Sequence, residues 1–145
     1  MVIGRAPQRS AGFTLIELLI TMGIIAILAA IAYPSYQSYV RSSDRTDATR
    51  SLLQTAQTLE RCYSQNFTYL ANCSIVSGTT SSPQGYYSIN VNLQSASQYT
   101  LTATPAESPQ TGDSTCAEFQ LLSSGQQLAQ NAGGTDTTQT CWGSN

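Results

Sequence analysis

The stretch GFTLIELLITMGIIAILAAIAYP, residues 12–34, decides the fold of this chain of 145 residues. Within it, residues 13–32 contain a single charged side chain, Glu17. A helix of that length rises about 30 Å, which is the thickness of the hydrocarbon core of a bilayer. Because Arg5 and Arg9 precede this apolar run, the positive-inside rule predicts a cytoplasmic N-terminus and an exported C-terminal part.

The composition disfavours most catalytic chemistries. The chain has no histidine and no lysine, and all six basic residues are arginine. A histidine-based triad, a Schiff-base lysine and a histidine-ligated metal are therefore excluded, and the carboxylates are too dispersed to suggest a paired-acid site. The formal net charge of −2 leaves little to neutralise phosphates, which disfavours nucleic-acid binding. We expect a protein that is not an enzyme and uses no metal or cofactor.

Two other interpretations of the N-terminus stay open, a secretory signal peptide and an ordinary membrane anchor. Residues 30–32, Ala-Ile-Ala before Tyr33, fit the small-residue cleavage site of a signal peptide. Glu17 argues against that interpretation, because a carboxylate costs about 2.5–3.5 kcal/mol at the centre of a span, and less near its end. A signal peptide would gain nothing from this residue.

The four cysteines all lie on the expected exported side. An even number in a small domain rich in serine, threonine, glutamine and asparagine predicts two disulfides in an oxidising compartment. Three pairings are possible, and we favour Cys62–Cys73 with Cys116–Cys141, because each bond then joins near neighbours. A four-thiolate zinc site is disfavoured because the chain contains no C-x-x-C pair.

The apolar run is expected to continue as an amphipathic helix. Pro34 predicts a kink, but residues 35–64 contain no further glycine or proline, so one helix of roughly fifty residues is expected. Its second half has an apolar side that requires a sheet to cover it. This side comprises Leu52, Ala56, Leu59 and Tyr63, and the polar side comprises Arg50, Gln54, Gln57 and Arg61.

Alternation of apolar and polar residues predicts an antiparallel sheet after this helix. Residues 66–85 are expected to be a loop, and the tail, residues 131–145, an ordered surface loop tied back by Cys141. The predicted fold is α+β, a long N-terminal helix packed on a four-stranded meander with a disulfide-bonded C-terminal region. The four strands are expected at residues 87–93, 99–104, 115–122 and 126–130.

The hexapeptide Gly-Phe-Thr-Leu-Ile-Glu at residues 12–17, between a basic leader and an apolar run, closely resembles the processing and assembly signature of type IV prepilins. The resemblance extends to the long helix with Pro34, the SQNFTY stretch, the YTLTATP strand and the final Cys-Trp pair, which are most similar to PilE-type minor pilins. It implies a removed leader at 1–12, a transmembrane and filament-core helix at 13–34, and an extracytoplasmic globular domain at 35–145.

The resemblance also implies a maturation pathway. Prepilin peptidase would cut between Gly12 and Phe13 and methylate the new amine of Phe13, while the precursor spans the inner membrane once. The chain would then join other pilin subunits through the pilus assembly machinery, in a surface pilus used for twitching motility or adhesion. In that filament Glu17 would pair with the Phe13 amine, of its own or an adjacent subunit, and so set the register. The segment before Pro34 could lose helicity in the filament.

Two related functions are alternatives, a DNA-receptor pilin used in competence and a type II secretion pseudopilin. A DNA receptor needs a basic stripe, and four arginines on one helix between residues 41 and 61 are a poor one. DNA is therefore not an expected partner. The two predicted disulfides and the C-terminal Cys-Trp pair favour a pilus subunit over a pseudopilin.

Three smaller features carry modest expectations. The mixed charges of Asp44, Arg45, Asp47 and Arg50 predict a solvated helix face or a contact with a neighbouring subunit. Trp142 is expected to cover the disulfide of Cys141. The tyrosines just after the apolar run suit an interfacial aromatic belt or filament packing; they are Tyr33, Tyr36 and Tyr39.

Overall fold

The computed structural model describes residues 12–71 and 78–143. The chain forms two compact units, Met1–Tyr36 and Gln37–Asn145, and helix α1, Leu15–Asn66, contributes to both. The long helix expected from the sequence is thus confirmed.

Helix α1 begins and ends with recognisable capping geometry. Thr14 precedes it, and its Oγ1 accepts a hydrogen bond from the backbone N–H of Glu17 at 3.3 Å. Pro34 lies inside α1, and the helix continues on both sides of it, so the predicted kink stays a prediction. The helix ends at Asn66 because Phe67 adopts φ +54°, the left-handed conformation common just after a helix, and donates its N–H to the Tyr63 carbonyl.

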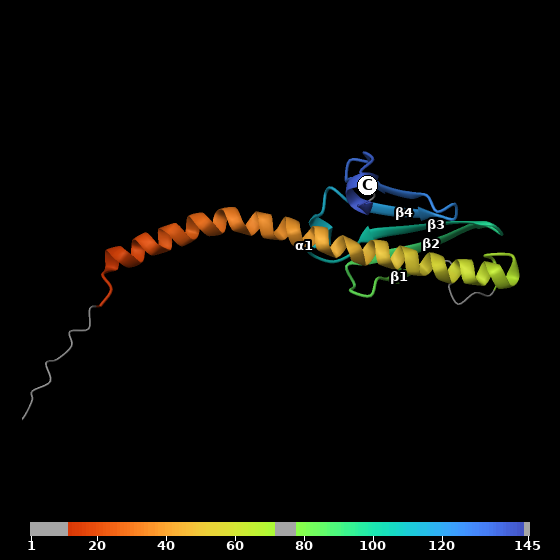
Figure 1. Cartoon of the computed structure of the whole chain (residues 1–145), viewed down its shortest axis with the longest axis horizontal. Helices are drawn as coiled ribbons and strands as arrows, with labels where there is room; N and C mark the ends of the chain where they lie inside the picture. Colours follow the sequence, from red (N-terminus) through yellow and green to blue (C-terminus); the bar gives the residue numbers. More distant parts are fainter. Residues whose placement is uncertain (1–11, 72–77, 144–145) are drawn as a thin grey trace, which may run out of the picture. The chain divides into compact units, whose positions relative to one another are not determined.

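The second unit contains an antiparallel sheet of five strands in the order β1-β2-β3-β4-β5, a simple meander (Figure 1). The prediction of four strands is therefore wrong by one. The missed strand lies inside the stretch expected to be a loop and pairs with the next strand, from Gly78↔Val91 to Ser81↔Ser88. Its sequence, GTTS, is exposed at every position, so it has no apolar alternation to detect. The strands are β1 Gly78–Ser81, β2 Tyr87–Ser95, β3 Gln98–Pro105, β4 Glu118–Leu122 and β5 Gln127–Gln130.

The core of this unit lies between the second half of α1 and one face of the sheet. Leu52 and Leu59, two of the predicted apolar residues of the helix, are fully buried, while Ala56 and Tyr63 are partly buried against the same cluster. Each fully buried large apolar side chain stabilises the fold by about 1.5–3 kcal/mol. The other large apolar side chains of the core are Tyr69, Tyr87, Ile89, Val91, Tyr99, Leu101, Phe119 and Leu121.

A disulfide between Cys116 and Cys141 closes the C-terminal region, as predicted, with Cα atoms 5.8 Å apart. The tail is not a loop throughout, because residues Thr138–Trp142 form a short helix, α2, that brings Cys141 to the bond. Cys62 is also disulfide-bonded. Its expected partner Cys73 lies outside the described residues, so that pairing stays a prediction.

The third predicted strand starts later than expected, at Glu118 instead of Thr115. The backbone N–H groups of Thr115 and Cys116 donate to Asp113 Oδ1 instead of to a neighbouring strand. A short 3₁₀ turn, η1, Gln110–Gly112, precedes them. The carboxylate at Asp113 thus organises a loop where the alternation of residue types suggested a strand.

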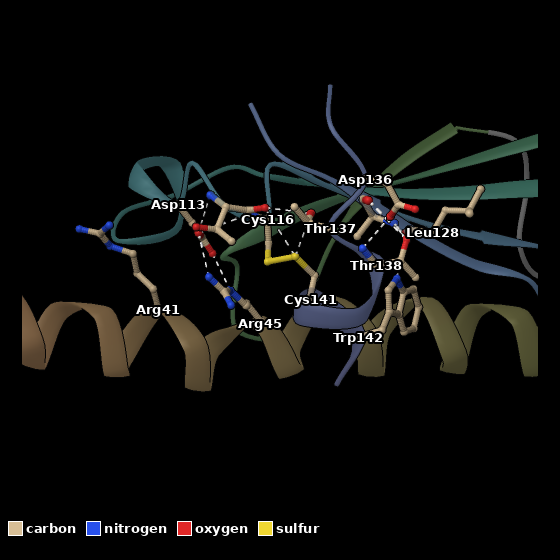
Figure 2. Close-up of a disulfide and its surroundings, with 12 residues drawn as sticks. Arg41, Arg45, Asp113, Cys116, Leu128, Asp136, Thr137, Thr138, Cys141 and Trp142 are labelled. Carbon is tan, nitrogen blue, oxygen red and sulfur yellow. Dashed lines mark hydrogen bonds and ion pairs between the residues drawn. A yellow bond between two sulfur atoms is a disulfide. The ribbon is translucent and has the colours of Figure 1, made fainter. Parts of the chain in front are cut away.

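Trp142 connects α2 to the sheet. Its indole N–H donates to the Leu128 carbonyl at 2.8 Å (Figure 2). Its ring meets Phe119 edge-on, with centroids 6.1 Å apart. The side chain is thus partly buried against the core, and the expected role of covering the disulfide stays a prediction.

Replacing both Cys116 and Cys141 by serine is expected to lower the free energy of unfolding by about 3 kcal/mol, because the unfolded chain loses a loop constraint. Urea titration of the detergent-solubilised full chain measures it, with fluorescence of Trp142, the single tryptophan, as the probe. The exposed substitution Ser124→Ala is the control. A loss below 1 kcal/mol contradicts a stabilising role for this bond.

Candidate functional site in the long helix

The first part of α1 presents apolar side chains on every side. From Phe13, just before the helix, to Ile31, the exposed fraction of the large apolar side chains runs from 53% at Ile24 to 83% at Phe13. The helix is long and apolar enough to cross a membrane. A surface of this kind is not stable in water, so lipid or other helices must cover it. The contributing residues are Phe13, Leu15, Ile16, Leu18, Leu19, Ile20, Met22, Ile24, Ile25, Ile27, Leu28 and Ile31.

Glu17 lies in the first turn of this helix. Thr14 and Glu17 have the spacing of a capping box, a signal readable in the sequence that our sequence interpretation missed. The helix dipole favours a negative charge at this end. Within the described residues, the Glu17 carboxylate makes no hydrogen bond or ion pair. In an apolar environment this charge needs a cationic partner.

Only part of the charged patch on the second half of α1 is solvated: Arg50 is exposed, but Arg45 and Asp47 have partners inside the unit. Arg45 forms a bidentate pair with Asp113, with Nε 2.7 Å from Oδ2 and Nη2 3.0 Å from Oδ1 (Figure 2). Asp47 is only 4% exposed and accepts hydrogen bonds from the Ser82 hydroxyl and, at 3.4 Å, from the Gln84 N–H. The prediction fails for Arg45 and Asp47 because both are oriented toward partners from the sheet side of the unit.

Asp113 is the hub of this polar cluster. Burial pushes its pKa upward, but the hydrogen bond and charge of Arg45, together with the N–H groups of Cys116 and Thr115, hold the pKa below its usual value. The carboxylate therefore stays ionised. It connects helix α1 to the loop that carries Cys116.

Arg41 also has partners within its own unit. Its Nη1 donates to the Gly112 carbonyl and its Nη2 to Gln37 Oε1, both at 3.0 Å. The Arg41 carbonyl accepts from buried Gln110, whose Oε1 in turn accepts from the Tyr87 hydroxyl at 2.9 Å. Arg41 and Arg45 are thus held by contacts to η1 and its neighbouring residues.

Near the other end of the helix, Glu60 holds two tyrosines. The hydroxyls of Tyr69 and Tyr99 donate to Glu60 Oε1 at 2.8 and 3.0 Å. Burial, then the hydrogen bond and charge of Glu60, raise the pKa of Tyr69 to about 12 and raise that of Tyr99 as well. Both phenols therefore stay protonated, and the segment after α1 is fixed to helix and sheet.

An exposed apolar helix continuing into a helix-on-meander unit with a C-terminal disulfide defines a type IV pilin. The sequence model of the prokaryotic N-terminal methylation motif matches residues 7–33. The model described as type IV minor pilin ComP, DNA uptake sequence receptor, matches residues 34–120, more than half of the chain. The chain therefore belongs to this type IV minor pilin family.

A solved minor pilin structure agrees with the fold. The non-core minor pilin PilV of Neisseria meningitidis is 24% identical, with a TM-score of 0.53 over 68% of this chain and 94% of that one. A type IV pilin from Shewanella oneidensis is 28% identical, with a TM-score of 0.46 over 60% of this chain and 89% of that one. Comparison with curated proteins finds no significant match.

The variant Asp113→Asn is expected to flatten the pH dependence of stability. Because the folded pKa lies below the unfolded value of about 3.9, this carboxylate stabilises the protein above that pH, and the contribution is lost as pH falls through the folded pKa. Unfolding titrations from pH 2.5 to 7 measure it, with exposed Glu107→Gln as control. A variant that keeps the slope of the unmodified chain contradicts this role.

Proposed function

We propose that this minor pilin is made as a membrane-inserted precursor, cut after Gly12, methylated on Phe13 and polymerised through α1 into a type IV pilus. The observation that carries the proposal is the exposed apolar first part of α1, whose one carboxylate, Glu17, has no partner among the described residues, and which lies within the match to a methylation motif. Inner membrane, prepilin peptidase and other pilins are then its successive partners. The proposed segments are the leader at 1–12, the membrane and filament-core helix at 13–34, and the exported domain at 35–145.

Gly12 and Phe13 act as substrate in this scheme. A Cβ added at Gly12 would meet no atom of the described residues within 4 Å, so packing among those residues does not require glycine there. The requirement fits an extended backbone lying close to a peptidase. Cleavage then frees the amine of Phe13, four residues before Glu17 in the sequence.

The carboxylate of Glu17 and the freed amine of Phe13 are opposite charges on an otherwise apolar surface. Burying either alone among packed helices is strongly unfavourable, whereas a charge pair restores most of the lost free energy. A newly added subunit in the wrong register would leave both unpaired. Glu17 is thus proposed as the residue that selects the correct stagger.

Glu17→Leu is expected to be processed and to remain in the membrane, yet to enter filaments at least tenfold less than the unmodified chain, an effect of about 1.4 kcal/mol or more. Quantitative mass spectrometry of sheared appendages and of membranes measures both pools. Glu17→Asp retains the charge and Met22→Leu the apolarity, so both should incorporate better than Glu17→Leu. Normal incorporation of Glu17→Leu rules out the register role.

A DNA-receptor role is a second candidate, because the family model that matches residues 34–120 is described as a DNA uptake sequence receptor. The charge distribution speaks against strong phosphate contact. Beyond Arg61 the sequence contains no basic residue, and Arg45 is neutralised by Asp113. Within the described part of the chain, Arg50 and Arg61 are the arginines without a hydrogen-bond or ion-pair partner.

Two available arginines predict a weak dependence of DNA affinity on salt. The slope of log K against log[salt] should be about −1.8, and Arg50→Gln with Arg61→Gln should bring it near zero. Titration of labelled duplex at 50–300 mM salt measures both. A slope steeper than about −4 favours the receptor role, because it requires phosphate contacts beyond these two arginines.

A further inference from the structure

The exposed side of α1 in the second unit carries a stripe that has no covering element among the described residues. Arg50 and Arg61 are eleven residues apart, about three helical turns and about 16 Å, so they share one side of the helix. Both are exposed. We name this stripe the arginine ridge; its residues are Thr46, Arg50, Leu53, Gln54, Gln57 and Arg61.

Two grooves run beside the ridge. One, of about 650 Å³, separates it from Pro83 and Gln84, and the other, of about 520 Å³, separates it from the β4–β5 turn. Leu53 borders both grooves and is 43% exposed, an apolar centre between two arginines. Interfaces between proteins commonly combine an apolar centre with arginine and a polar rim.

The opposite charge collects on a different surface of the same unit. Glu118 and Asp136 both line a cavity of about 230 Å³ whose apolar wall includes Leu128 and Ala129. Glu118 accepts hydrogen bonds from two glutamine amides, and neither carboxylate has a cation beside it within the described residues. We name this surface the acidic edge. It offers an apolar wall to an arginine stem and carboxylates to its guanidinium.

We propose that the arginine ridge of one copy docks on the acidic edge of another copy of this chain. The inference rests on the proposed assembly function and deepens it by naming the contacting surfaces. Complementary charge on the two surfaces carries the argument, because the exposed arginines of the described globular unit, Arg50 and Arg61, both lie on the ridge, whereas Arg45 is paired with Asp113 and Arg41 is half-buried. The two surfaces differ, so the contact is heterologous and propagates into a helical polymer unless its rotation closes a ring.

The contact is tested by charge reversal in the full-length chain. The ridge variant Arg50→Glu with Arg61→Glu and the edge variant Glu118→Arg with Asp136→Arg should each reduce self-association about tenfold, because like charges then face each other. Co-expression of the two variants should restore it, since each reversed surface then finds its complement. The control Glu107→Arg changes an exposed carboxylate outside both surfaces and should have no effect.

Self-association is read by a photo-crosslinking amino acid placed at Gln57 on the ridge, in detergent-solubilised chain and in cells. A crosslink to a peptide of the β4–β5 region of a second copy supports the proposal. Crosslinks only to another protein, or unchanged crosslinking in both reversed variants, overturn it. Because the detergent readout needs no filament, failure of this contact is distinguishable from failure of the assembly function, which is judged by a Phe13-initiated peptide in sheared pili.

Discussion

The bidentate pair between Arg45 and Asp113 is the interaction on which the second unit depends. It joins the middle of α1 to the loop before β4, and the same carboxylate orders the backbone at Cys116. Through the disulfide to Cys141 that order reaches α2, and through Trp142 it reaches β5 and the core. A single ionised side chain therefore links the helix, the sheet and the tail.

The same pair shapes the electrostatics of the surface. Arg45 is paired with Asp113 and Arg41 is half-buried against neutral acceptors, so the exposed positive charge of the unit lies at Arg50 and Arg61 on the exposed side of the helix. The sheet and tail contribute carboxylates and uncharged hydroxyls and amides. Positive and negative charge are thus concentrated on different surfaces of the unit, although its formal net charge is small. Such an arrangement suits ordered contact between subunits better than tracking a nucleic-acid backbone.

Much of the fold could be predicted because its signals are local. The predominantly apolar run at residues 13–32 specifies the first part of α1, period-two alternation specifies β2 and β3, and proximity along the chain selects Cys116 with Cys141. Strand β1 could not be predicted, because its four small residues are exposed, show no alternation of apolar and polar side chains, and form a strand only by pairing with β2. The internal roles of Arg45 and Asp47 escaped because their partners, Asp113 and Ser82, lie 68 and 35 residues away along the chain.

The ties between α1 and the rest of its unit have a mechanical consequence. Arg45 and Asp47 hold the helix near one end of the unit, and Glu60 holds it near the other. A load along the helix axis therefore acts on these contacts together, in shear, and does not break them one after another. The ties therefore let the globular unit resist tension along α1 as one block.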